Sequence, residues 1–298
     1  MNVTIVVNPH AGKQNILREI SAVEKVFRDG GCEVATVQTE TREQAKRLLE
    51  DSAEKPDVLV CCGGDGTLSE TVNTLLNAGK TTPLGYIPSG STNDFATFLG
   101  IPKEPVKAAQ RIVSGEAKPI DVGRFGYKYF IYVASFGAFT QSSYSTTQSL
   151  KNSLGHLAYV IEGIKELPQI KSYHVGLETE HGTVEGDYVF GSVSNSTSFG
   201  GIIKMDPKEV APADGLFEIM LVKMPKNLIE LHKILFSLMS GKYDEEVITF
   251  LHARQALFTC SEPMPWSLDG EYAADLVAST TLLGILSIPA WAYALGIV

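Results

Sequence analysis

The chain has 298 residues, of which 44% are hydrophobic and 20% are charged, and its formal net charge is −9. This is an ordinary globular composition, which excludes collagen-like, coiled-coil and largely disordered chains. Duplex nucleic acid is a poor partner for so acidic a chain, because its phosphates attract basic surfaces. The length fits one large domain or two of ordinary size.

The four cysteines show no spacing typical of a disulfide framework or a zinc site. Cys61 and Cys62 lie within an apolar run, where cysteine acts as a small hydrophobe. The first residues show no secretion signal. These features predict a protein of a reducing, cytoplasmic compartment.

The first third of the chain alternates short apolar runs with amphipathic stretches. The apolar run at 57–62 is continuous, as is typical of a buried parallel strand. The alternation predicts a doubly wound α/β domain that binds ligands beyond the carboxyl ends of its strands. Strands are predicted at 3–7, 33–38, 57–62 and 83–88, and helices at 15–29, 41–53, 67–78 and 105–114.

After about Asp121 the chain changes to strands separated by glycine, proline or polar turns. This pattern predicts an antiparallel β-sandwich or barrel. We therefore expect an α/β domain over 1–122 and a β-rich domain over 123–285. The strand-like segments are 127–136, 173–180, 182–195, 216–224 and 255–260, and two helices are predicted at 150–167 and 227–239.

The segment 276–298 contains no charged residue. Its length and apolar character allow a helix that spans a bilayer. Its serines, threonines and central Pro289 favour two strands instead, at 282–288 and 290–298. In that interpretation the last strand, at about 286–298, returns to the first domain.

A glycine-rich turn, Gly63-Gly64-Asp65-Gly66-Thr67, follows the strand at 57–62 and precedes a predicted helix. Its glycines allow a ligand to approach the backbone closely, and the N–H groups at the start of a helix suit a phosphate. Asp65 would repel a phosphate unless Mg²⁺ lies between them. Thr67 and Glu70 have the spacing of a capping box. The alternative is a plain strand–helix turn, and the spacing is not that of a P-loop.

Polar loops also follow the first and fourth predicted strands, at 8–13 and 88–95. In an open parallel sheet these loops share the ligand-binding edge with the glycine-rich turn. Three such loops at one edge are harder to explain as three unrelated turns than as a ligand site.

The chain resembles the bacterial members of the diacylglycerol kinase catalytic-domain family, which are related to sphingosine kinases and to NAD kinases. The turn at 63–67 alone is shared with NAD kinases, and the later motifs point to lipid kinases. The motifs stand in family order: N-P-x-x-G (8–12), G-G-D-G-T-x-x-E (63–70), I-P-x-G-S-T-N-D-F (87–95), D-V-G (121–123), N-S-x-x-x-G-G (195–201), P-A-D-G-L-F (212–217) and L-D-G-E-Y (268–272).

The resemblance implies a role for each matching residue. Glu271 would be the general base, with Asp65 as a second catalytic residue. From the residues alone, Glu271 follows a hairpin dipeptide, Asp269-Gly270, and fits an ordinary surface position as well. The residues implied to hold ATP are Asn8, Pro9, His10, Ala11, Gly12, Thr39, Gly64, Asp65, Gly66, Thr67, Leu68, Ser69, Glu70 and Ser91.

Two magnesium sites are implied by the same resemblance. A structural Mg²⁺ would be bound by Asp214 and by the carbonyl oxygens of Ala211 and Leu216. Candidate ligands for a catalytic Mg²⁺ are Asp65, Asp94 and Asp121, which lie at or near the ligand edge of the predicted sheet. The plain alternatives are a helix cap for Asp94 and turns for Asp121 and Asp214.

The activity implied by the resemblance is an ATP- and Mg²⁺-dependent lipid kinase that converts diacylglycerol to phosphatidic acid. Its partners would be a lipid substrate and the inner membrane surface, which it would visit peripherally, and a homodimer is left open. The alternatives are a kinase of another lipid or long-chain alcohol, an NAD kinase-like enzyme, a nucleotide sensor, and a protein anchored by 276–298.

Overall fold

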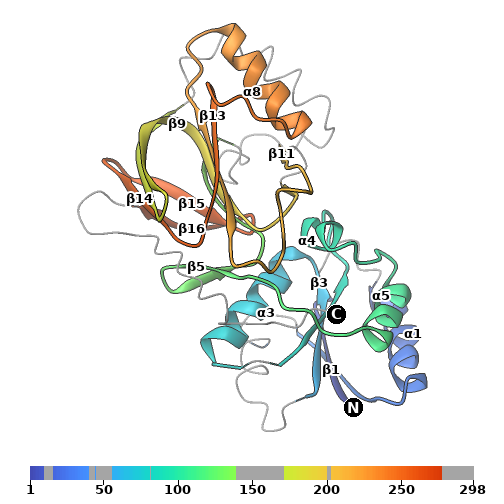
Figure 1. Cartoon of the computed structure of the whole chain (residues 1–298). Helices are drawn as coiled ribbons and strands as arrows, with labels where there is room; N and C mark the ends of the chain where they lie inside the picture. Colours follow the sequence, from blue (N-terminus) through green and yellow to red (C-terminus); the bar gives the residue numbers. More distant parts are fainter. Residues whose placement is uncertain are drawn as a thin grey trace. The chain divides into compact units, whose positions relative to one another are not determined.

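The computed structural model describes residues 1–9, 16–39, 44, 56–80, 82–138, 171–199 and 203–276 (Figure 1). They belong to two compact units, of which the first extends from Met1 to Asp121 and the second begins at Val122. The helices expected at 41–53 and 150–167, and the strands expected after 276, lie outside the described residues.

The first unit is built on a four-stranded sheet in the order β2-β1-β3-β4, and each neighbouring pair is parallel. The doubly wound α/β prediction is therefore confirmed. Strand β3 is buried along its whole length, as its continuous apolar run predicted. The elements are β1 (Asn2–Val7), α1 (Ile16–Asp29), β2 (Glu33–Gln38), β3 (Val58–Gly63), α3 (Asp65–Asn77), β4 (Leu84–Pro88), α4 (Asp94–Phe98) and α5 (Pro105–Ser114).

Helices cover both faces of this sheet (Figure 1). On one face Thr71 of α3 lies against Cys61 of β3, with Oγ1 3.7 Å from Sγ. On the other face Ile112 of α5 packs against Gly85 of β4, where an added Cβ would lie only 2.9 Å from its Cδ1. The two buried faces leave the strand ends as the places where this unit can meet a ligand.

The second unit is antiparallel and β-rich, as predicted. Its long strand β9 pairs with β8 through its first half, and with β7 and β12 through its second half, so that one strand belongs to both layers of a sandwich. The elements are β5 (Gly123–Phe125), β6 (Lys128–Phe130), β7 (Val133–Gly137), β8 (Tyr173–Thr179), β9 (Gly182–Ser194), β10 (Ser198–Phe199), β11 (Ile203–Lys204), β12 (Phe217–Lys223), α8 (Leu228–Ser240), β13 (Ile248–Ala253), β14 (Ala256–Cys260), β15 (Met264–Leu268) and β16 (Glu271–Leu276).

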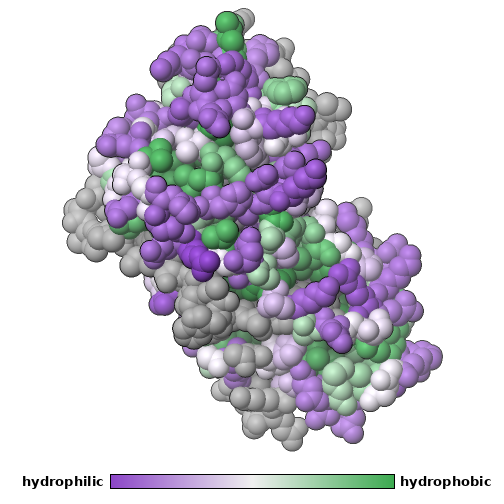
Figure 2. Space-filling view, viewed as in Figure 1, coloured by the Kyte–Doolittle hydropathy of each residue, from purple (hydrophilic) through white to green (hydrophobic). Residues whose placement is uncertain are grey.

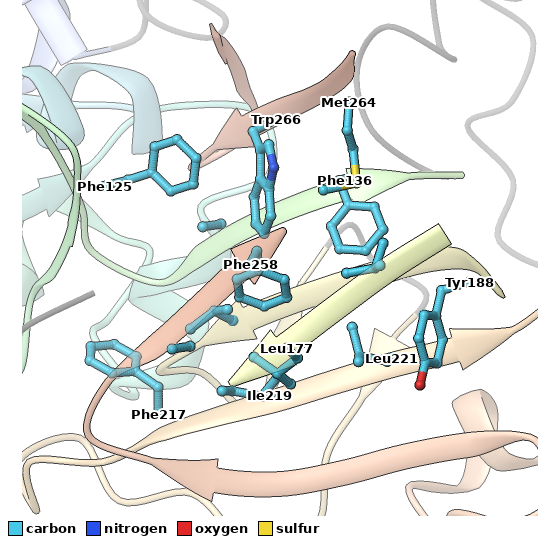
Figure 3. Close-up of a cluster of buried hydrophobic side chains, with 14 of the residues drawn as sticks. Phe125, Phe136, Leu177, Tyr188, Phe217, Ile219, Leu221, Phe258, Met264 and Trp266 are labelled. Atoms are coloured by element: carbon cyan, nitrogen blue, oxygen red, sulfur yellow. The ribbon is translucent and has the colours of Figure 1, made fainter. Parts of the chain in front are cut away.

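An aromatic core fills the space between the two layers (Figure 3). Trp266 of β15 is 1% exposed, and its ring centroid lies 5.0 Å from that of Phe136 and 5.0 Å from that of Phe258. Burying a side chain of this kind contributes about 1.5–3 kcal/mol. This packing holds β15 in the core, and it therefore fixes the position of the turn that follows β15.

Two predictions need correction or refinement. The segment 127–136, expected to be one strand, is divided into β6 and β7, because the backbone N–H groups of Ile131 and Tyr132 bond to the carboxylate of Asp269 instead of to a strand. The helix expected at 227–239 is α8, which Asn227 caps through its side chain.

All four cysteines are free, and three of them are buried, including the two of the apolar run. Within the described ranges, no helix is long and apolar enough to cross a bilayer.

Candidate active site

The carboxyl ends of the four parallel strands are tied together by backbone hydrogen bonds. Each bond joins the first residues of one loop to the end of a neighbouring strand. As a result, the loops that follow the strands begin side by side at one edge of the sheet. The three bonds run from Thr39 N to Val7 O (2.9 Å), from Asn8 N to Cys62 O (3.1 Å) and from Ser89 N to Gly63 O (2.8 Å).

The loops after β3 and β4 touch through their backbones. A Cβ added at Gly90 would lie 2.6 Å from the Cα of Gly64, and one added at Gly64 would lie 3.1 Å from the Cα of Gly90. Only residues without a side chain allow this approach. Two of the glycine-bearing loops predicted to share one edge are thus held in direct contact.

Helix α3 begins at Asp65, two residues earlier than expected. Its N-cap is Gly64, which has no side chain to accept a cap hydrogen bond. The capping box expected from Thr67 and Glu70 is therefore wrong, because Thr67 already lies inside the helix and its Oγ1 accepts a bond from Asn8 Nδ2 (3.1 Å). The N-cap residue thus leaves the first N–H groups of a long helix without a cap from its own side chain, which suits the binding of an anion.

Asp65 binds the start of the neighbouring helix α4. Its Oδ2 accepts a hydrogen bond from Asp94 N (2.9 Å), and its Oδ1 accepts a longer one from Phe95 N (3.4 Å). Burial raises the pKa of this carboxyl, whereas the backbone bonds from 93–95 and the Tyr86 hydroxyl oppose the rise. Asp65 therefore links the two loops in addition to the contact between their glycines.

Asn93 gives the loop after β4 its shape. It adopts a left-handed backbone conformation, with φ of 54°. Its side chain accepts from Gly90 N and donates to Gly90 O, both at 2.9 Å. Asparagine tolerates this conformation better than most residues, because its short side chain bonds to the local backbone.

Ser89 lies at the same edge and was not a predicted site residue. Its Oγ is buried and has no hydrogen-bond partner among the described atoms. A buried hydroxyl without a partner is costly, so a ligand oxygen at this place would be stabilising. The chemistry of the edge thus fits a nucleotide phosphate, with an uncapped helix start and an unsatisfied donor in adjoining loops.

The other residues implied to hold ATP occupy varied positions. Leu68 is fully buried in the core of the unit. Thr39 is 6% exposed, and its Oγ1 lies 3.5 Å from Val7 O. Asn8, Pro9, Gly66, Ser69 and Glu70 are partly exposed and Ser91 is exposed, whereas His10, Ala11 and Gly12 lie outside the described residues.

The candidate ligands of a catalytic Mg²⁺ are not gathered into one cluster. Among the described residues, no three side chains of His, Cys, Asp or Glu are placed to hold a metal ion. Asp121 is buried, at 8% exposed, and the Asp94 backbone is held by Asp65. Mg²⁺ commonly takes one or two carboxylates together with waters and substrate phosphates, so a three-carboxylate cage is not needed for it to bind.

The turn before β12 carries the candidate structural site. The exposed Asp214 accepts a hydrogen bond from Leu216 N at Oδ1 (2.9 Å), which folds the turn around the carboxylate. Asn195 Nδ2 donates to the carbonyl of Pro212 (3.2 Å) and ties this turn to the end of β9. A carboxylate with nearby backbone carbonyls is an all-oxygen donor set, which fits Mg²⁺.

Glu271 follows a two-residue hairpin turn between β15 and β16, and it is partly exposed. Asp269 and Gly270 have φ of 48° and 82°, the conformation that Asp-Gly favours in such turns. The hairpin predicted from this dipeptide is confirmed.

The Asp269 carboxylate is 4% exposed and accepts hydrogen bonds from three successive backbone N–H groups, those of residues 131–133, at 3.0–3.3 Å. Its own N–H donates to Val133 O (2.8 Å). Asp269 thereby fastens the turn that presents Glu271. The sequence identifies Asp269 only as a turn residue, since nothing local to it indicates these distant partners.

Family models match both units of the chain. The Diacylglycerol kinase catalytic domain model matches residues 2–125, and the YegS C-terminal NAD kinase beta sandwich-like domain model matches residues 134–288. A diacylglycerol kinase of Bacillus subtilis (strain 168) is 34% identical over 275 residues, which cover 91% of this chain and 90% of that protein. The chain belongs to the diacylglycerol kinase family. It is therefore a kinase, and the family predicted from the seven motifs is confirmed.

Other members of the diacylglycerol kinase family are similar along their whole length. The diacylglycerol kinase of Staphylococcus carnosus is 31% identical over 280 residues, which cover 92% of this chain and 90% of that protein. A crystal structure of a diacylglycerol kinase from Bacillus anthracis matches with a TM-score of 0.69 and 22% identity over 97% of both chains. Another structure from that organism has a TM-score of 0.76 and 23% identity over 97% and 96% of the two chains. These two structures share the fold.

Proposed function

We propose that this kinase transfers the γ-phosphoryl group of ATP to the hydroxyl of diacylglycerol and so forms phosphatidic acid. The observation that carries the proposal is the edge of the first unit, where Gly64 and Gly90 meet beside the uncapped start of α3. The names of the relatives in Bacillus and Staphylococcus support the lipid acceptor.

In this proposal the loops of the first unit hold the nucleotide. The N–H groups at the start of α3 and the Ser89 hydroxyl donate to phosphate oxygens, while Thr39 borders the adenosine. Mg²⁺ supplies cationic charge to the phosphates when bound. Asp65, Asp94 and Asp121 are its candidate ligands. Such positioning and charge stabilisation account for most of the catalysis of phosphoryl transfer.

Glu271 is the proposed general base of the second unit. Its carboxylate takes the proton of the lipid hydroxyl as the oxygen attacks, and the Asp269 turn keeps it in place. A structural Mg²⁺ at Asp214, with the carbonyls of Ala211 and Leu216, would brace the turn before β12. Because diacylglycerol resides in bilayers, the enzyme would visit the inner leaflet as a peripheral, cytoplasmic protein.

The test is an ATP-dependent phosphorylation assay over a panel of acceptors, which includes diacylglycerol, monoacylglycerol, ceramide, a long-chain alcohol and NAD. We expect diacylglycerol to be the best acceptor, and Glu271→Gln to lower kcat by about three orders of magnitude with little change in the KM for ATP. The matched control is Glu178→Gln, which neutralises an exposed glutamate of β8.

Both the acceptor panel and the comparison of variants have outcomes that contradict the proposal. Preference for NAD would assign the chain an NAD kinase-like activity, and preference for another lipid would change the acceptor. Full activity of a folded Glu271→Gln protein would remove the general base while leaving the kinase itself in place.

A further inference from the structure

Strand β4 of the first unit carries a tyrosine at a buried position. All five residues of β4 are buried. The visible surface of the first unit mixes polar and apolar residues (Figure 2), but Tyr86 contributes nothing to it, because it is fully buried. A buried hydroxyl is costly unless it has a hydrogen-bond partner, and an apolar side chain of similar size would avoid that cost. The partners of this hydroxyl therefore indicate why a tyrosine is present.

The alternation of side chains along β4 directs Tyr86 toward α3. Gly85 faces α5, since Ile112 packs against it. The next residue along a strand points to the opposite face, so Tyr86 lies on the face where its register partner Cys61 contacts α3. On this face the ring of Tyr86 lies near that of Phe95 in α4, with the two centroids 6.5 Å apart.

The hydroxyl of Tyr86 lies between two acceptors, one from each glycine-bearing loop. It is hydrogen-bonded to the carboxylate of Asp65, at the start of α3, and it lies 3.4 Å from Oδ1 of Asn93, just before α4. Burial, and then the charge of Asp65, raise the pKa of this hydroxyl, so it keeps its proton and remains a donor. One buried hydroxyl thus connects the loop after β3 with the loop after β4.

Both acceptors also shape the loops that they belong to. Asp65 Oδ2 caps α4 from outside by accepting from Asp94 N (2.9 Å), whereas Asn93, the N-cap residue of α4, makes no cap bond through its own side chain. The Asn93 side chain instead binds the N–H and the carbonyl of Gly90, both at 2.9 Å. Gly90 is the residue that touches Gly64, so a shift of either acceptor would disturb the contact between the loops.

We propose that Tyr86 is a positioning residue of the nucleotide site, and that its hydroxyl holds Asp65 and Asn93 at the separation that the nucleotide phosphates require. This inference rests on the proposed binding of ATP at this edge of the sheet. Tyr86 acts through the two loops, since protein covers it completely and it has no surface to offer a phosphate. With its hydroxyl in place the loops are preorganised, so less conformational freedom is lost when the nucleotide binds.

The test is a calorimetric titration of the full-length protein with ADP in the presence of Mg²⁺ and without lipid. Tyr86→Phe removes the hydroxyl and keeps the ring, and we expect it to raise the dissociation constant of ADP about tenfold, as for a lost bond to a charged group. The matched control is Tyr188→Phe. It removes another buried hydroxyl, which bonds to Thr249 in the second unit, and it should leave ADP affinity unchanged.

Thermal unfolding of the two variants without nucleotide separates positioning from a purely structural role. Both variants lose a buried hydrogen bond, so both should unfold at a somewhat lower temperature than the wild type. Titrations are made below both midpoints, so that each variant is folded when its affinity is measured. In steady-state assays Tyr86→Phe should raise the KM for ATP and leave the KM for diacylglycerol unchanged.

The outcomes distinguish this inference from the proposed function. Wild-type affinity for ADP in Tyr86→Phe would overturn the positioning role and leave the kinase proposal in place. An equal loss of affinity in Tyr188→Phe would also overturn it, because the effect would then follow from lower stability alone. A wild-type protein that does not bind ADP would overturn the nucleotide site, and this inference with it.

Discussion

Each unit of the protein holds its candidate functional loop with one aspartate, but the two aspartates differ in how deeply they are buried. Asp65 starts a helix in the first unit and is partly exposed; it accepts bonds from Asp94 N (2.9 Å) and Phe95 N (3.4 Å), with Asn93 N and the Tyr86 hydroxyl as further partners. Asp269 in the second unit is 4% exposed, and its carboxylate accepts hydrogen bonds from three successive backbone N–H groups, those of residues 131–133. The first loop also relies on contact between glycines, whereas the second relies on the carboxylate. The difference indicates that removing the carboxylate should damage the second unit more than the first.

The largest effect is expected for Asp269→Ala. It would leave three buried N–H groups without an acceptor and lower the free energy of unfolding by about 3 kcal/mol. Asp269→Asn keeps one acceptor oxygen and a residue that tolerates positive φ, so its cost should be about 1 kcal/mol. Calorimetry of both variants checks this order. An alanine variant as stable as the asparagine variant would show that the turn does not depend on these bonds.

An intermediate effect on stability is expected at the close contact between Gly64 and Gly90 in the first unit. Gly90→Ala would force a Cβ to within 2.6 Å of the Gly64 backbone, so we expect a loss of about 1–3 kcal/mol of stability together with weaker ATP binding. Gly64→Ala meets its neighbour at 3.1 Å and should cost less. Thermal unfolding and nucleotide titration measure the two variants side by side. If both bind ATP like the wild type, contact between these loops is not part of the nucleotide site.

The smallest effect concerns the charge of Asp65. Burial raises the pKa of its carboxyl in the folded chain, so the folded state holds this proton more tightly than the unfolded state. Stability from this group is therefore greatest below its unfolded pKa of about 3.9 and is lost as the pH rises through the raised folded pKa. Asp65→Asn should remove that decline, which the difference in urea midpoints between pH 4 and 7 would reveal. An identical pH dependence in the two proteins would contradict the raised pKa.

Much of the fold follows from local sequence patterns. The apolar run 57–62 predicts a buried parallel strand, and β3 is one. Asp269-Gly270 predicts a hairpin turn, and the two residues form one. These succeed because burial and turn geometry depend on residues close together in the chain.

The incorrect predictions concern features whose structure depends on residues far away in the chain. The start of α3 was placed too late, because the pairing of Asp65 with the backbone of α4, 29 residues away, is not visible locally. The local pattern of 127–136 predicts one strand, but its interruption is caused by Asp269, which lies 137 residues from Tyr132 in the chain. The buried Ser89 hydroxyl was missed because its sequence neighbours resemble an ordinary loop.

The bond from Ile131 to Asp269 joins residues 138 positions apart. During synthesis at about 5–20 residues per second, the N–H groups of 131–133 would leave the ribosome some seconds before the acceptor that they need. Until then these N–H groups must donate to water, and the second unit cannot complete its folding. Such a long loop to close makes folding slow, so a translating ribosome would carry the second unit incomplete until after Asp269 has been synthesised.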